Sequence, residues 1–179
     1  MNDQIHHWTK KDKLLYALSM APFLLALGVA LYVLGVDSPG AALIFVFLCL
    51  MANIFQAGAC VGCPYRGSYC PAIFGVYAGN LISTIIYRNR VHEERFFAVN
   101  AKLAEAFCLL TLLFPLYWLF FRAWYYPLIY LALVGTHLTL FMPTQCEKCG
   151  YSNTCPGGVF WRQCRGKLVS RQKRTTKSG

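Results

Sequence analysis

Residues 14–59 read LLYALSMAPFLLALGVALYVLGVDSPGAALIFVFLCLMANIFQAGA and decide the fold. Between Lys13 and Arg66 the only charged residue is Asp37, which lies in the turn-forming tetrapeptide Asp-Ser-Pro-Gly. This tetrapeptide divides the stretch into two apolar segments, residues 14–36 and 41–59. Each segment is long enough to cross a hydrocarbon core of about 30 Å as a helix. The stretch therefore predicts a helical hairpin that spans a membrane.

A second apolar hairpin follows. Residues 96–121 form a long run whose only charges are Lys102 and Glu105, and residues 125–143 form another. Aromatic side chains, among them Trp118 and Trp124, cluster at the short connection, as they do at membrane interfaces. We therefore predict an all-α integral membrane protein with four transmembrane helices. These helices form two repeated hairpins, each followed by a cysteine-rich cytoplasmic loop, in a single membrane domain that covers residues 1–179.

The composition agrees with a membrane protein. Of the 179 residues, 57% are hydrophobic and 13% are charged, about half the charged fraction of soluble domains. Lys and Arg number 17 against 7 acidic residues, and with four spans nearly all of them share one face, Arg122 being the exception. Because basic residues are retained in the cytoplasm, we expect both termini and the cysteine loops to be cytoplasmic, in a bacterial or archaeal cytoplasmic membrane.

Two segments remain outside the four spans. Residues 71–87 are uncharged, but a fifth span there would move the basic cluster at residues 88–95 to the opposite face. We therefore predict an interfacial or re-entrant helix for residues 71–87. Residues 165–179 form a basic, flexible tail that we expect to lie on membrane lipid, and we expect no nucleic-acid partner because the rest of the chain sits in lipid.

Cysteine is the residue type that carries chemistry. Of the nine cysteines, Cys49 and Cys108 lie within apolar runs, where we expect them to pack as small hydrophobes. The other seven follow the hairpins as C-x2-C-x6-C-P and C-x2-C-x5-C-P-x7-C, which divides the chain into repeat 1 (residues 14–87) and repeat 2 (residues 96–164). They are Cys60, Cys63, Cys70, Cys146, Cys149, Cys155 and Cys164.

The spacing of these seven cysteines favours metal binding. Cytoplasmic thiols are kept reduced, so a cluster of them there is more typical of metal ligands than of disulfides. Iron–sulfur clusters use a tight C-x2-C group with a distant cysteine before proline, and in two-cluster ferredoxins that cysteine ligates the other cluster. The doubled pattern predicts one or two clusters, of the 4Fe–4S type. The alternatives are a structural zinc site made by Cys146, Cys149, Cys155 and Cys164, and thiol–disulfide chemistry.

Three further side chains are candidates for the cofactor site. Two four-iron clusters need about eight ligands, and the motifs offer seven, so His92 is a candidate for the eighth. Arg66, between Cys63 and Cys70, is a candidate donor to cluster sulfides or an interfacial arginine. His137 lies within the last span, where a histidine is either a ligand or quinone contact or a buried hydrogen-bonded side chain.

In its paired cysteine–proline motifs, residues 60–71 and 146–156, the chain resembles the membrane-bound polyferredoxins that accompany periplasmic nitrate reductase, methylamine dehydrogenase and nitrous-oxide reductase. The resemblance covers these motifs and the hairpins around them. It implies a subunit of a larger oxidoreductase complex, more a redox carrier than a catalyst. Such a subunit passes electrons between a cytoplasmic redox carrier and quinone or another membrane subunit.

Two other functions fit the same motifs. A four-span bundle with C-x2-C also resembles the quinone-linked disulfide-generating oxidases and the vitamin K epoxide reductases, which would require an extracytoplasmic cysteine face. A zinc-stabilised membrane assembly subunit is the third hypothesis. The sequence contains no Ser/His/Asp pattern, P-loop or carboxylate pair that would favour a hydrolase or a nucleotide-binding protein.

Overall fold

The computed structural model describes residues 7–63, 66, 69, 81–90, 93–149, 158–159 and 161–166. Its elements are α1 (Lys10–Asp37), α2 (Pro39–Ala59), η1 (Cys60–Gly62), α4 (Ser83–Ile86), α5 (Glu94–Leu113), α6 (Leu116–Arg122), α7 (Tyr125–Phe141) and η3 (Met142–Cys146). Four helical stretches are long and apolar enough to cross a membrane: Lys10–Asp37, Pro39–Ala59, Glu94–Arg122 and Tyr125–Cys146. The predicted set of four apolar helices is confirmed. Of the ambiguous segment 71–87, residues 71–80 lie outside the described residues, and α4 is a single turn.

Local sequence explains where the first two helices begin and end. The Thr9 side chain accepts a hydrogen bond from the Asp12 amide, and the Asp12 carboxylate accepts one from the Thr9 amide, which makes a capping box at the start of α1. At the other end of α1, Ser38 alone separates the two helices. Pro39 then occupies the first turn of α2, where its missing N–H costs no hydrogen bond.

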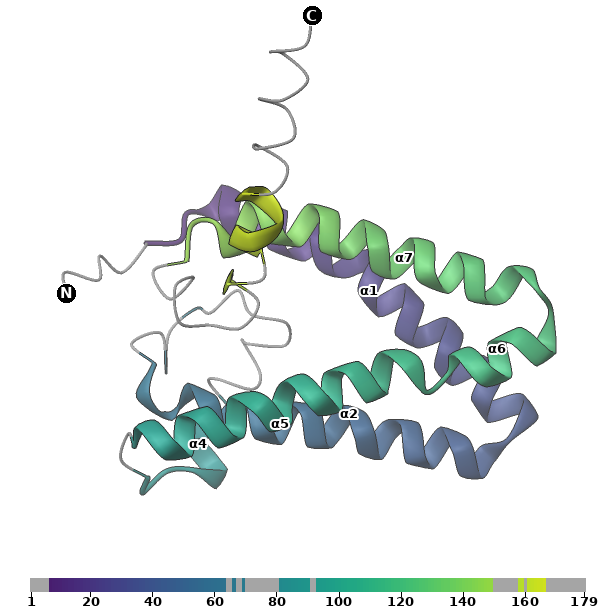
Figure 1. The fold of residues 1–179 in the computed structure, drawn as a ribbon, viewed down its shortest axis with the longest axis horizontal. Helices are drawn as coiled ribbons and strands as arrows, with labels where there is room; N and C mark the ends of the chain where they lie inside the picture. Colours follow the sequence, from purple (N-terminus) through teal and green to yellow (C-terminus); the bar gives the residue numbers. More distant parts are fainter. Residues whose placement is uncertain are drawn as a thin grey trace, which may run out of the picture.

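The helices pack in pairs that join the two halves of the chain. The most extensive contacts are those of α2 with α5 and of α1 with α7, whereas α1 contacts α2 less. Figure 1 shows the two pairs meeting at the end where α1 turns into α2 and α6 into α7, and diverging toward the opposite end. We expected two hairpins of consecutive helices. Each helix instead packs mainly with a helix of the other hairpin.

Prolines interrupt the second half of the bundle at two places. Pro115 separates α5 from α6 because it has no N–H to continue the helical hydrogen bonds. Pro143 lies in η3, a π-helical turn in which the Glu147 amide donates to the Met142 carbonyl at 3.3 Å. A π turn accommodates one more residue than an α turn, and such turns occur often at functional sites.

The core lies toward the end where the helices meet. Ala26 and Ala30 of α1 are completely buried, and small residues one turn apart allow helices in a membrane to approach closely. At that end the Arg122 guanidinium lies 2.9 Å from the Asp37 carboxylate and joins the α6–α7 connection to the α1–α2 turn. Many large apolar side chains on the outer faces are exposed, as in a protein whose helices contact lipid.

Candidate functional site

Both C-x2-C pairs lie at the end of the bundle where the helix pairs diverge. Cys60 follows the last residue of α2 and begins η1, and Cys146 is the last residue of η3 after α7. In Figure 1, α2 and α7 run toward the same end, where α1 and α5 begin. The helices therefore deliver the two cysteine pairs to one side of the molecule.

The first pair is a tight turn that Arg66 holds in place. The Cys63 amide donates to the Cys60 carbonyl at 3.1 Å, and the Arg66 amide donates to the Cys63 carbonyl at 2.9 Å. The Arg66 guanidinium also donates to the carbonyls of Ser83 and Tyr87, both at 2.9 Å. Ser83 begins the single turn α4 and Tyr87 follows its last residue, so the guanidinium contacts both ends of this turn. In this structure Arg66 therefore joins the cysteine turn to α4, and its role toward cluster sulfides stays a prediction.

A close contact with α5 positions the end of α2, the helix that precedes the first pair. Asn100 of α5 is 6% exposed, and its amide nitrogen donates to the Phe96 carbonyl at 2.9 Å. Its side chain lies against Gly58, where an added Cβ would be 2.3 Å from the Asn100 Oδ1 atom. Sequence reasoning missed this contact, although an asparagine in an apolar run is a signal for helix–helix packing.

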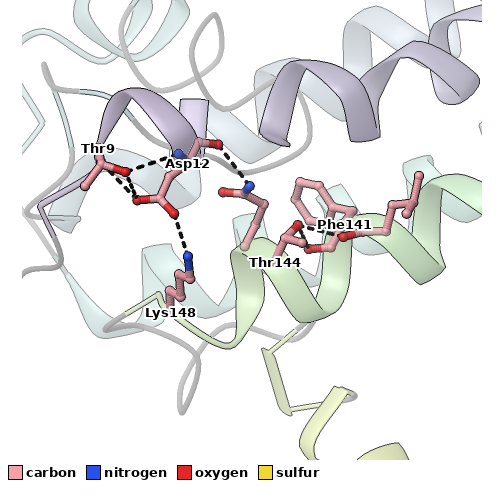
Figure 2. A network of polar contacts seen from close by, with 7 residues as sticks. Thr9, Asp12, Phe141, Thr144 and Lys148 are labelled. Atoms are coloured by element: carbon pink, nitrogen blue, oxygen red, sulfur yellow. Dashed lines mark hydrogen bonds and ion pairs between the residues drawn. The ribbon is translucent and has the colours of Figure 1, made fainter. Parts of the chain in front are cut away.

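The second pair is anchored to the first turn of α1. Lys148, between Cys146 and Cys149, places its Nζ atom 2.5 Å from the Asp12 Oδ1 atom. The buried Gln145 side chain donates to the Asp12 backbone carbonyl at 3.3 Å. Figure 2 shows the contact of Lys148 with Asp12 beside the Thr9 cap. The Thr9 hydroxyl lies 2.7 Å from the Asp12 Oδ2 atom. Sequence reasoning missed Asp12, although a single acid among the lysines of residues 10–13 was a signal for it.

Cys164 lies in a segment that also contacts the second pair. Residues 161–166 are helical, and Arg165 makes an ion pair with Glu147, which lies between Cys146 and Cys149. The side chain next to Cys164 in sequence therefore reaches the turn that carries the second pair. All five described candidate cysteines are partly buried.

His137 is buried between α7 and α1. Its Nδ1 atom lies 2.7 Å from the Ser19 carbonyl oxygen, and because a carbonyl only accepts, Nδ1 carries the proton. The ring lies between Phe23 and Phe141, with centroid distances of 4.8 and 5.1 Å. Pro22 of α1 has no N–H to donate to the carbonyl of Leu18, the residue before Ser19. Nε2 has no hydrogen-bond partner among the described residues.

The described residues contain no complete metal site. Among them, no three His, Cys, Asp or Glu side chains lie together closely enough to hold a metal ion. Cys70, Cys155 and His92, which complete the predicted ligand set, lie outside the described residues. The expected packing role of Cys49 agrees with its contact to the core between α1, α2 and α7. Cys108, in α5, is also partly buried.

The chain matches no protein-family model, no curated protein and no solved structure. A functional interpretation therefore depends on the cysteine motifs and on the positions of the helices that carry them.

Proposed function

We propose that this chain is a membrane-embedded iron–sulfur electron-transfer subunit of a larger oxidoreductase complex. It would pass electrons between a cytoplasmic redox carrier and quinone or another membrane subunit. The cysteines of the two motifs would hold one or two clusters, of the 4Fe–4S type, at the membrane surface. The reaction chemistry would belong to the other subunits of the complex.

The observation that supports this proposal is the placement of the two C-x2-C pairs. They follow α2 and α7, which end on the same side of the bundle. Each pair also has a basic side chain beside or within it, Arg66 and Lys148, and each of these side chains joins its pair to a neighbouring helix. A cysteine beside a cation is suited to bind a metal, since only the deprotonated sulfur is a ligand and a nearby positive charge favours it.

The chain's own residues would do three things for the cluster. The thiolates of the two motifs would bind iron, and the bound cluster would accept and release single electrons. The apolar helices would fix the site at the membrane surface, close to quinone dissolved in the bilayer. The excess of basic residues, with a net charge of +10, would attract an acidic carrier protein to this face.

Metal analysis of protein purified without oxygen tests the proposal. We expect iron and sulfide in the purified protein, a brown colour, and an electron paramagnetic resonance signal after reduction. Cys60→Ser and Cys146→Ser should each lower the iron content. Cys49→Ala and Cys108→Ala are matched controls that should leave it unchanged, because these cysteines lie within α2 and α5. A colourless protein that contains zinc would overturn the proposal.

Thiol labelling in intact cells tests the cytoplasmic orientation. A maleimide that cannot cross the membrane should leave Cys60 and Cys146 unlabelled until the cells are opened. Cys164 provides an internal control, because the four-span topology puts it on the same face. Labelling of these cysteines in intact cells would show that the cysteine face is extracytoplasmic. It would favour the alternative of a quinone-linked thiol–disulfide oxidoreductase.

A further inference from the structure

We propose that residues 8–16, which lead into α1 and form its first two turns, are a common anchoring surface for the two cysteine groups, and that Tyr69 and Lys148 are the positioning residues that dock them there. This inference extends the proposed function, because it states how a site made from two separate repeats is brought together. It depends on three sets of contacts that all involve this short segment.

The first set of contacts holds the loop of the first cysteine group. Tyr69 follows Cys63 by six residues in sequence, and its ring packs against Trp8 at 6.1 Å and against Tyr16 at 5.8 Å between centroids. The Lys13 ammonium lies 5.2 Å from the centre of the same ring, in the range of a cation–π contact. The ring of Tyr69 is therefore held by three side chains of one helix end.

The second set holds the turn of the second cysteine group. Lys148 makes its ion pair with Asp12, whose other carboxylate oxygen is occupied by Thr9. Asp12 is almost completely buried, so loss of Lys148 would leave a buried carboxylate without its charge partner. Asp12 lies between Trp8 and Tyr16 in sequence at intervals of four residues, so it shares with Tyr16 the face of α1 that Tyr69 contacts.

A third contact continues from this surface to the end of α7. The rings of Tyr16 and Phe141 lie 6.3 Å apart, and Cys146 packs against the apolar cluster that contains Phe141. Tyr69 therefore packs on a side chain that also contacts the helix leading into the second pair. By contrast, Cys60 and Cys63 follow α2, which packs mainly against α5. Tyr69, which follows the first pair in sequence, thus packs against the other helix pair.

Crosslinking of native thiols tests this arrangement. The full-length protein is purified in detergent without oxygen, freed of metal by a chelator, and treated with a short bis-maleimide. The bridged cysteine pairs are identified by mass spectrometry. Cys70, which follows Tyr69 directly in sequence, should bridge to Cys149. Tyr69→Ala should lower the yield of this bridge by about threefold or more, a coupling typical of residues in contact.

Matched variants separate docking from a general loss of structure. Tyr69→Phe keeps the ring and should keep the bridge. Tyr32→Ala removes an exposed tyrosine elsewhere on α1 and should leave the yield unchanged. Lys148→Gln should raise the alkylation rate of Cys149, and Lys148→Arg should restore the slow rate of the unchanged protein.

The outcome for docking is distinct from the outcome for iron. If Cys70 bridges to Cys60 or Cys63 and not to Cys149, or if Tyr69→Ala leaves the yield unchanged, the common anchoring surface is wrong even in a protein that contains iron. If the bridge forms as expected but the protein binds no iron, the anchoring surface stands and the proposed redox function fails. Iron content is therefore measured in the same preparations before the chelator is added.

Discussion

The contact between Gly58 and Asn100 predicts a specific cost for adding one methyl group. An alanine at position 58 would place its Cβ 2.3 Å from Oδ1 and 2.6 Å from Cγ of Asn100. Carbon atoms pack at about 3.5–4.0 Å, so the buried Asn100 side chain would have to move by about 1 Å and would strain its hydrogen bond to Phe96. Overpacking of this kind costs about 1–3 kcal/mol.

The net effect also includes helix propensity. Gly58 is the next-to-last residue of α2, so alanine there gains less than the about 0.5–1 kcal/mol of a mid-helix replacement, and Gly58→Ala should destabilise the protein by about 1–2 kcal/mol on balance. Gly135→Ala in α7 is the matched control, because a Cβ at position 135 meets no atom within 4 Å. That variant should be as stable as the unchanged protein or slightly more stable.

The assay is reversible unfolding in mixed micelles of sodium dodecyl sulfate and dodecyl maltoside, followed by circular dichroism. Adding Asn100→Ala to Gly58→Ala should recover part of the lost stability, because it removes the atoms that clash. Equal stability of Gly58→Ala and Gly135→Ala would refute the reasoning. A double variant whose loss of stability exceeds the sum of the losses in the two single variants would also refute it.

Three single contacts and one partly buried hydroxyl each give a further prediction. Arg122→Ala should lower the free energy of unfolding by about 0.2–1 kcal/mol through loss of the exposed pair with Asp37, and the loss should shrink in high salt; equal losses at all salt concentrations would contradict this. Arg66→Lys should speed amide hydrogen exchange in α4, because a lysine lacks the planar guanidinium that donates to the carbonyls of both Ser83 and Tyr87. His137→Phe keeps the aromatic packing but removes the hydrogen bond, so unfolding should become easier by about 1 kcal/mol, with His137→Ala worse. Burial raises the pKa of Tyr87, so the stability that its neutral hydroxyl contributes is complete below about pH 10 and lost at higher pH; Tyr87→Phe should remove that alkaline loss from a titration of unfolding free energy.

The sequence was sufficient to predict the four helices because apolar runs of membrane length have few other structures available to them. It was not sufficient to predict which helices pair. In a membrane nearly every face of a helix is apolar, so hydrophobicity does not identify the packed face. The pairing depends on details such as the buried Ala26 and Ala30 and the contact of Asn100 with Gly58, whose partners are unknown until the helices are placed.

The same limit applies to the candidate site. The position of both C-x2-C pairs at the same end of the bundle could be predicted. Each pair follows the second helix of a hairpin, and an even number of spans returns the chain to the side where it began. The side chains that hold the pairs could not be predicted. Lys148 and Asp12 are 136 residues apart, and nothing in the local pattern of either residue indicates the other. Thr9 and Asp12 did carry a local signal, the spacing of a capping box, which marks the helix start and not the ion pair.

The π turn at Met142–Cys146 makes the length of this segment as important as its composition. Each residue of a helix rotates the chain by about 100°, so a deletion of one residue here would turn Cys146 and Lys148 away from α1 while leaving every side chain chemically intact. Substitutions in this turn should be tolerated far better than changes in its length. A shortened turn would move the Cys146 sulfur away from the side chains of α1 without changing any side chain.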